Sequence, residues 1–261
     1  MKKGISRARA GRILSKERTC AMPENRVQVI AHRGASNDAP ENTLAAFELA
    51  LEQGADCIEL DCRVTCDGHL VVIHDATVDR TTNGSGKVSE MSLAEIRALD
   101  AGSWFHPRFA GERVPTLQEA LLLLRGRCAV NVEIKGTKAH QPGIEEKVVG
   151  LLRAARVPAE SVIISSFDSS YFPRLRAIDA ALRLALIFKA APPDLYELDV
   201  DLLHPSLESV APGLMQKAKA SGLQVNVWTV DAEQGWCRAL ALGVDGIITN
   251  VPGKLRAFLS A

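Results

Sequence analysis

Short runs of β-branched residues alternate with stretches of helical hydrophobic spacing along most of this chain. That alternation is typical of parallel strands joined by crossover helices, because a parallel pair needs a connection long enough to cross the sheet. With 261 residues, 47% of them hydrophobic, the chain can fill one large core and fits a single α/β domain, a (β/α)₈ TIM barrel. The predicted strands are Val27–His32, Cys57–Val64, Ala129–Lys135, Val162–Ser166, Leu184–Phe188, Asp201–His204, Gln224–Val230 and Gly246–Thr249.

Helix signals stand between these strands. Ser92 and Glu95 have the spacing of a capping box, and so do Thr116 and Glu119. Gly54, Gly222 and Gly243 stand where helices should end. Apolar residues recur at helical spacing at Leu44, Phe47 and Leu51, at Leu117, Ala120, Leu121 and Leu124, and at Ile144, Val148, Leu151 and Leu152.

A long segment from Asp75 to Pro115 interrupts this rhythm after the second strand. It follows an extra extended piece, Val71–His74, and it exceeds the length of an ordinary βα connection. We therefore expect a small insertion over the barrel mouth. A doubly wound open sheet is the alternative fold, because Leu184–Phe188 and Asp201–His204 are weak strand candidates, but no Gly-rich dinucleotide fingerprint supports it.

The charges of the whole chain balance, with 31 basic and 31 acidic residues, so they favour neither nucleic acid nor an anionic membrane as a partner. The first 20 residues hold seven Lys or Arg and one Glu. We expect residues 1–25 to be a disordered basic segment and residues 26–261 to form one domain, with a nucleic-acid or membrane arm as the less favoured alternative. No apolar run has the length of a secretory signal or a membrane span, which predicts a cytoplasmic protein without stable membrane insertion. The sequence predicts no oligomeric state.

Six cysteines without a secretion signal are expected to be reduced thiols. Cys57, Cys62 and Cys66 cluster around one predicted strand, but their spacing matches no Cys-pair zinc motif. By alternation along the strand, Cys57 shares the inward face of Glu59 at a deeper position, and Cys62 points outward. Zinc binding is therefore disfavoured, and redox control of the cluster stays a hypothesis.

Ionisable residues gather at the C-terminal ends of several predicted strands, where the functional groups of TIM barrels lie. Residues two apart on a strand share a face, so Glu59 and Asp61 should both point into the barrel, as should Glu133 and Lys135. Three buried carboxylates beside one lysine are costly unless a cation neutralises them. Their oxygen donors predict one divalent cation, Mg²⁺ or Ca²⁺ in preference to Zn²⁺. A structural ion pair is the alternative for Glu133 and Lys135.

Two histidines flank the predicted carboxylate site. His32 ends the first strand, and His74 ends the extended piece that follows the second. Imidazole titrates near neutral pH, so this pair suits a general acid and a general base. Arg33 adds a guanidinium fork suited to phosphate oxygens. The combination predicts cleavage of a phosphodiester.

Longer motifs surround these residues and extend along most of the chain. They are His32-Arg33-Gly34, Ala39-Pro40-Glu41-Asn42-Thr43, Gly54-Ala55-Asp56, Glu59-Leu60-Asp61, His74-Asp75, Asp79-Arg80-Thr81-Thr82-Asn83-Gly84, Pro115-Thr116-Leu117, Val132-Glu133-Ile134-Lys135, Val227-Trp228-Thr229-Val230 and Asp245-Gly246-Ile247-Ile248-Thr249-Asn250. Together they resemble the glycerophosphodiester phosphodiesterase family, within the phospholipase C-like phosphodiesterase superfamily. The resemblance implies a TIM barrel with a small insertion after the second strand. It also implies metal-dependent hydrolysis of a small-molecule glycerophosphodiester to sn-glycerol 3-phosphate and an alcohol.

The resemblance also implies roles for individual residues. By position it assigns catalysis to His32 and His74, metal binding to Glu59, Asp61 and Glu133, phosphate contacts to Arg33 and Lys135, and the glycerol side to Phe167 and Trp228. An ordinary place in the core is the alternative for the two aromatic residues. Glu41 and Asn42 are expected to cap the first helix and brace the site, and whether His204 faces the pocket is left open.

Two other functions compete with this prediction. A phospholipase D-like enzyme acting on lysophospholipids would need an exposed apolar surface near the mouth, which the sequence does not reveal. A non-catalytic barrel that only binds phosphorylated polyols would need neither an acid nor a base. The presence of both His32 and His74 therefore favours catalysis.

Overall fold

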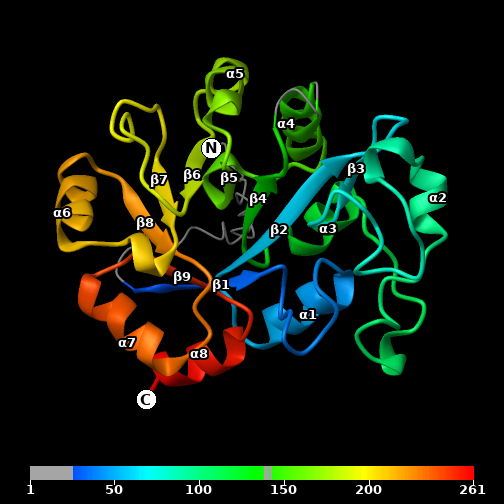
Figure 1. Cartoon of the computed structure of the whole chain (residues 1–261), viewed down its shortest axis with the longest axis horizontal. Helices are drawn as coiled ribbons and strands as arrows, with labels where there is room; N and C mark the ends of the chain where they lie inside the picture. Colours follow the sequence, from blue (N-terminus) through cyan, green and yellow to red (C-terminus); the bar gives the residue numbers. More distant parts are fainter. Residues whose placement is uncertain (1–25, 138–140, 142) are drawn as a thin grey trace, which may run out of the picture.

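A computed structural model of the chain describes residues 26–137, 141 and 143–261, so the predicted basic segment 1–25 lies outside the described residues. Eight parallel strands form a closed barrel in the order β1-β9-β8-β7-β6-β5-β4-β2, and β2 pairs with β1 to close the ring (Figure 1). The TIM barrel is confirmed, and the open-sheet alternative is wrong. The strands are β1 Gln28–His32, β2 Cys57–Val64, β4 Ala129–Ile134, β5 Val162–Ser166, β6 Arg183–Phe188, β7 Leu202–Pro205, β8 Gln224–Val227 and β9 Gly246–Thr249.

Most predicted strand ends agree with the structure to within one residue, and the exception is β8. Its pairing stops at Val227, three residues before the predicted end at Val230. The neighbouring β7 ends at Pro205, so only an isolated bridge between Ser206 and Trp228 continues the ladder. The last predicted residues of this strand therefore form the start of a loop at the barrel mouth.

Helices surround the barrel, with one gap in the alternation. The helices that follow barrel strands are α1 Leu44–Glu52, α3 Leu117–Leu124, α4 Ile144–Ala154, α5 Phe172–Ile178, α6 Pro212–Ala220, α7 Glu233–Leu242 and α8 Pro252–Leu259. The connection from β6 to β7 contains turns in place of a helix. Pro192 and Pro193 lie in this connection, and consecutive prolines prevent a helix from forming through them.

Local capping explains where the helices begin and end. Thr116 and Glu119 form the predicted capping box of α3, which contributes about 1 kcal/mol of stability. The predicted end of α7 at Gly243 is confirmed, since this residue has a left-handed backbone. Thr43 caps α1 and accepts a hydrogen bond from the backbone of Ala46, so the expectation that Glu41 and Asn42 form this cap is wrong.

The insertion has its own small core. A short strand, β3 Leu70–Val72, pairs antiparallel with β2, and the helix α2 Leu93–Arg97 follows it with two short 3₁₀ turns. Its buried apolar residues are Val71, Ile73, Val78, Val88, Ile96, Ala101 and Val114. In Figure 1 the insertion lies beside the barrel, next to α1 and α3, and not over its opening as expected. Two of its arginines bind the β1–α1 loop: Arg108 donates to the carbonyl oxygen of Asp38, and Arg80 donates to the carboxylate of Glu41.

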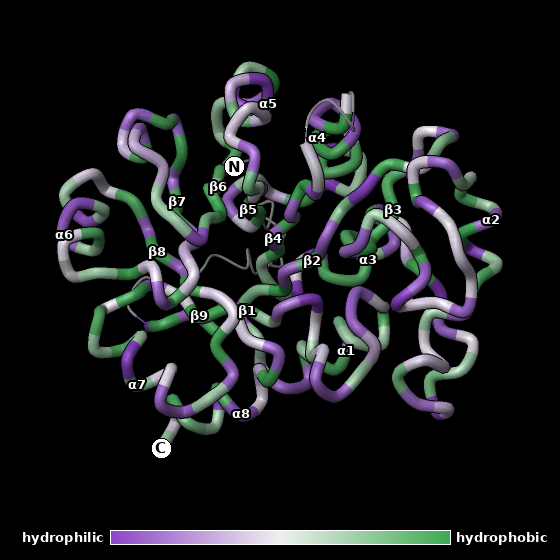
Figure 2. Tube along the Cα trace, viewed as in Figure 1, coloured by the Kyte–Doolittle hydropathy of each residue, from purple (hydrophilic) through white to green (hydrophobic). Residues whose placement is uncertain are grey.

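Apolar side chains fill the lower part of the barrel and the layer between strands and helices, and Figure 2 shows these hydrophobic stretches of chain along the strands. Cys57 packs inside the barrel with Ile30 and Ile248, and Cys62 packs in the layer under the helices, as the alternation along β2 predicts. Burial raises the pKa of both thiols, which disfavours the thiolate that oxidation requires. No helix in the described part of the chain is long and apolar enough to cross a membrane.

The turn after β1 places strong demands on the backbone. Arg33 has φ +56° and Gly34 has φ +84°. A Cβ atom on Gly34 would stand 2.7 Å from the backbone of Ala46 in α1, closer than real contacts allow. A glycine is therefore required here, both by its conformation and by the approach of the helix.

We predict that Gly34→Ala lowers the free energy of unfolding by about 2 kcal/mol, because the new methyl group collides with helix backbone that cannot move cheaply. Gly150→Ala is the matched control. Gly150 lies within α4 with open space around it, so the same change should stabilise by up to about 1 kcal/mol. Urea denaturation followed by circular dichroism measures both. Equal stability of the two variants would contradict the proposed constraint at Gly34.

Candidate active site

Three carboxylates converge at the barrel mouth, as the alternation along the strands predicts. Glu59 and Asp61 project from β2 and Glu133 from β4, with Asp61 and Glu133 in register on the two paired strands. Each offers an oxygen within 4.8 Å of the others. Their exposed fractions are 3%, 0% and 8%, so little water can neutralise their charge. Among the described residues this is the one group of three or more candidate ligands found that could hold a metal ion.

Two cationic side chains balance part of this charge. Lys135 lies just after β4, and its Nζ is 2.5 Å from Glu133 Oε1 and 3.4 Å from Asp61 Oδ1. The Nε of Arg33 is 3.2 Å from Asp61 Oδ2, and its backbone N–H donates to Glu59 Oε2 over 2.9 Å. The ion pair considered for Glu133 and Lys135 is thus present. Glu59 Oε1 nevertheless has no hydrogen-bond partner among the described residues, although it is buried.

The pKa values of the three acids express this shortage of positive charge. Burial raises the pKa of Glu59 well above its usual range, and repulsion from Asp61 and Glu133 adds to the effect. Burial and repulsion from Asp61, in part offset by Lys135, raise the pKa of Glu133 to about 7. Burial acts on Asp61 as well, but Lys135 and Arg33 outweigh it and lower its pKa. A further cation would let all three ionise, so the cluster can serve as a metal site.

The β1–α1 loop, at the same end of the barrel, holds these groups in place. Asn42, which has φ +58°, donates to Asp61 Oδ2 over 2.7 Å and accepts from the backbone N–H of Asp61. Glu41 accepts from Arg33 over 2.8 Å and also from Arg80 in the insertion. The bracing expected of Glu41 and Asn42 is therefore present, although neither caps the helix.

His32 is held by an uncharged partner. Its Nδ1 lies 2.7 Å from Oδ1 of Asn250, which follows β9. The Asn250 amide nitrogen donates to Asp231 over 2.6 Å, which leaves the amide oxygen facing the histidine as an acceptor. Burial, helped by the charge of Arg33, lowers the pKa of His32 to about 4. The ring is therefore neutral at pH 7, with its proton on Nδ1 and a lone pair on Nε2.

His74 is held by a charged partner. Its Nδ1 lies 2.6 Å from Oδ1 of Asp75, and Arg80 donates to the other oxygen of Asp75 over 2.7 Å. Arg63 of β2 fixes the backbone by donating twice to the carbonyl oxygen of His74. Burial lowers the pKa of His74, while the carboxylates of Asp61 and Asp75 oppose that change. Asp75 offers this imidazole a full negative charge, whereas Asn250 offers His32 only a hydrogen bond from a neutral amide oxygen, which raises its pKa less than burial lowers it.

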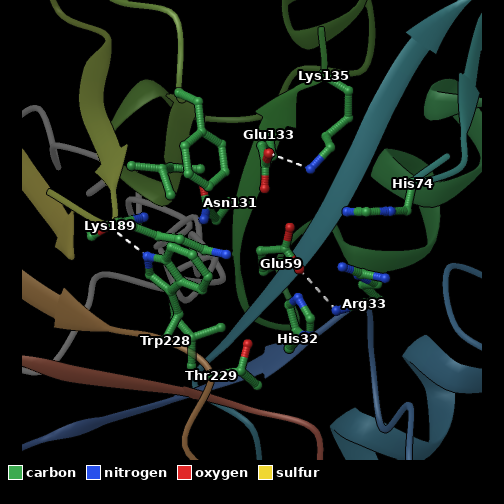
Figure 3. A pocket seen from close by; sticks show the side chains of 14 residues that line it. His32, Arg33, Glu59, His74, Asn131, Glu133, Lys135, Lys189, Trp228 and Thr229 are labelled. Atoms are coloured by element: carbon green, nitrogen blue, oxygen red, sulfur yellow. Dashed lines mark hydrogen bonds and ion pairs between the residues drawn. The ribbon is translucent and has the colours of Figure 1, made fainter. Parts of the chain in front are cut away.

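A cavity of about 230 Å³ connects these groups. All the predicted site residues line it except Asp61, which is fully buried behind them. Figure 3 shows His74 on one side, Trp228 on the other, and Glu59 and Glu133 between them. The rings of Phe167 and Trp228 meet edge to face at 5.6 Å. Phe167 is 51% exposed, so the alternative of an ordinary core aromatic is wrong for it.

Sequence reasoning missed three residues of the site. Asn131 and Lys189 line the cavity, and Asn250 binds His32. The position of Asn131, two residues before Glu133 on the inward face of β4, could have indicated it. Lys189, just after β6, and Asn250, just after β9, are at strand ends as well. Asn250 ends one of the motifs that carry the family resemblance, although no role was predicted for it, and no pattern distinguished Lys189 from other loop residues. His204, which was left open, does line the cavity.

Comparison with known proteins places this site in a family. The model of the glycerophosphoryl diester phosphodiesterase family matches residues 32–254. A glycerophosphodiester phosphodiesterase of Caldanaerobacter subterraneus subsp. tengcongensis is 44% identical over 232 residues, which cover 87% of this chain and 95% of that protein. The corresponding enzyme of Bacillus altitudinis is 34% identical and covers 87% of this chain and 96% of its own length.

Solved structures agree with the sequence matches. An Oleispira antarctica phosphodiesterase in complex with the product sn-glycerol-3-phosphate superposes with a TM-score of 0.82 at 31% identity, over 90% of this chain and 97% of that one. A glycerophosphodiester phosphodiesterase from Agrobacterium tumefaciens gives a TM-score of 0.77 at 34% identity, over 90% of this chain and 100% of that one. The barrel, the residues at its mouth and the extent of these matches lead to one conclusion: the chain belongs to the glycerophosphoryl diester phosphodiesterase family.

Proposed function

We propose that this protein hydrolyses glycerophosphodiesters to sn-glycerol 3-phosphate and a free alcohol. The observation that carries the proposal is the placement of two differently partnered histidines on a cavity whose walls also hold three carboxylates, an arginine and a lysine. A barrel that only binds phosphorylated polyols would gain nothing from that arrangement. The names of the relatives support the same substrate class.

The donor set fits one divalent cation, Mg²⁺ or Ca²⁺. Glu59, Asp61 and Glu133 would hold it, and the buried, unpartnered Oε1 of Glu59 among the described residues is the observation that favours it. A cation bound there supplies Lewis-acid polarisation of the phosphoryl oxygens. Arg33 and Lys135 line the cavity beside the triad and would bind the remaining phosphate oxygens, offsetting the charge that builds on phosphorus.

The partners of the histidines support an assignment that the sequence left open. His32 presents an unprotonated Nε2 and is suited to remove a proton from the nucleophile, which is water or the 2-hydroxyl of the glycerol. His74, paired with Asp75, is suited to carry a proton and give it to the leaving alcohol. If the 2-hydroxyl attacks, the alcohol leaves and a cyclic phosphate forms. The two histidines then exchange their roles as base and acid when water hydrolyses the cyclic phosphate.

We predict that metal-stripped protein releases no sn-glycerol 3-phosphate from glycerophosphocholine and that Mg²⁺ or Ca²⁺ restores release. His32→Ala should abolish it even with the cation, because loss of a general base costs about 100-fold or more. An enzyme-coupled assay for sn-glycerol 3-phosphate measures both. Activity on a lysophospholipid alone would favour the lipase alternative, and binding of sn-glycerol 3-phosphate without turnover of any diester would favour the non-catalytic barrel.

A change of leaving group tests the assignment of acid and base. We predict that His74→Ala loses most of its activity on glycerophosphocholine but recovers about 100-fold of it on the glycerophosphodiester of p-nitrophenol, whose leaving group needs no proton. His32→Ala, the matched control, should be inactive on both. Rescue of His32→Ala and not of His74→Ala would reverse the two assignments.

The raised pKa of Glu133 predicts how cation binding depends on pH. Without a cation this pKa is about 7, so below that pH a proton occupies the site that the cation needs. Affinity should therefore rise about tenfold from pH 6 to pH 8, with release of protons on binding. Isothermal titration calorimetry with Mg²⁺ or Ca²⁺ in buffers of different ionisation enthalpy measures this. Glu133→Gln should bind more weakly and show a smaller dependence in this range, with the remainder due to Glu59, whose pKa is also raised. A flat wild-type profile would contradict the prediction.

A further inference from the structure

The floor of the cavity holds polar atoms that the proposed mechanism does not use. Asn131 on β4 and His204 on β7 both line the cavity, yet each side chain is only 1% exposed. Oδ1 of Asn131 and Nδ1 of His204 have no hydrogen-bond partner among the described residues. An unpaired buried polar atom destabilises a fold, so two of them at the floor of one cavity indicate a ligand that forms the missing hydrogen bonds.

The hydrogen bonding of His204 determines whether its unpaired Nδ1 is a donor or an acceptor. Burial and the charge of Arg183 lower the pKa of this histidine to about 3, so the ring is neutral. Its Nε2 lies 3.1 Å from the amide nitrogen of Asn226 on β8. An amide nitrogen only donates, so Nε2 accepts and the ring proton resides on Nδ1. At the floor of the cavity, His204 therefore offers an unpaired donor, and the carbonyl oxygen of Asn131 offers an unpaired acceptor.

The two atoms belong to a rigid part of the barrel. Asn131 is in register with Glu59 on the paired strand β2 and precedes Glu133 by two residues on the same inward face. The indole N–H of Trp228 donates to the carbonyl oxygen of His204 over 2.6 Å, which links Trp228, on the wall of the cavity, to β7. The floor, the wall and the carboxylates thus keep fixed positions relative to one another.

We propose that Asn131 and His204 form a subsite for the hydroxyl groups of the glyceryl end of the substrate. A hydroxyl both donates and accepts, which matches an acceptor and a donor on the same floor. The glyceryl end is common to all glycerophosphodiesters, so a closed, fixed floor suits it, and the open mouth suits an alcohol of variable size. His74, the proposed acid at the leaving group, stands on the side of the cavity away from Trp228, which leaves the Trp228 side for the glyceryl end (Figure 3). This inference rests on the proposed function.

Ligand binding to the metal-loaded wild-type protein tests the subsite without turnover. Isothermal titration calorimetry would compare sn-glycerol 3-phosphate, methyl phosphate and phosphocholine, which share a phosphate and differ in the alcohol. We expect sn-glycerol 3-phosphate to bind at least about tenfold more tightly than methyl phosphate, because only its hydroxyls can reach the floor. Equal affinities would overturn the proposal, and tighter binding of phosphocholine would assign the floor to the leaving alcohol and overturn it as well.

Substitutions then test whether Asn131 and His204 cause this difference in affinity. Asn131→Leu removes the acceptor at similar volume, and His204→Phe removes the donor while keeping a ring. Each should lower the ratio of affinities for sn-glycerol 3-phosphate and methyl phosphate about tenfold. Ser161→Ala is the control, since it also deletes a buried hydrogen bond, to the carbonyl of Pro158, away from the cavity. Its ratio should match the wild type. Variants that weaken both ligands equally would indicate a structural role only.

The same variants separate this inference from the proposed function. We expect the ratio of kcat/KM for glycerophosphocholine over bis(p-nitrophenyl) phosphate, a diester without hydroxyls, to fall about tenfold in each of them. A wild type that cleaves bis(p-nitrophenyl) phosphate but no glycerophosphodiester would refute the proposed function. A wild type that cleaves both, with variants whose ratio does not change, would refute the subsite alone.

Discussion

The burial of three carboxylates within 4.8 Å of one another is the constraint on which the rest of the barrel mouth depends. Two cationic side chains, Arg33 and Lys135, approach them, and neither contacts Glu59 Oε1. The resulting pKa values differ in direction within one cluster, lowered for Asp61 and raised for Glu59 and Glu133. A site built only for stability would replace such a cluster by apolar groups, which pack in the barrel layer directly below it.

The backbone adopts unfavourable φ angles at residues that bind this cluster. Arg33 and Asn42 both have positive φ without being glycine, and both contact Asp61. Gly34 lets the chain turn between them while α1 packs directly against the loop. Their conformations are costly in isolation and are held by the hydrogen bonds that they make to β2. The loop is therefore as much a part of the site as the side chains at the strand ends.

The two histidines differ because different elements reach them. Asn250, oriented by Asp231, offers His32 an uncharged acceptor, while Asp75, oriented by Arg80, offers His74 a carboxylate. The first arrangement keeps a neutral ring with a free Nε2, and the second offsets part of the decrease in pKa that burial causes at His74. The polar floor at Asn131 and His204 adds a third kind of environment to the same cavity, neutral and directional. One small pocket thus combines three buried carboxylates, two histidines with unlike partners and a neutral polar floor.

The sequence alone determined the strand and helix rhythm, the barrel, and the inward alternation that brings Glu59, Asp61 and Glu133 together, because these follow from local periodicity and the rule that parallel strands end at one face. The resemblance to a family supplied Phe167 and Trp228, which periodicity could not. Only the tertiary structure decided the partners of the histidines, the absence of a helix between β6 and β7, and the pocket positions of Lys189 and His204. Asn250 follows the last strand and meets His32 on the first, 218 residues away. Such contacts arise from closure of the barrel, and no local pattern encodes which loop residues that closure brings into hydrogen-bond distance.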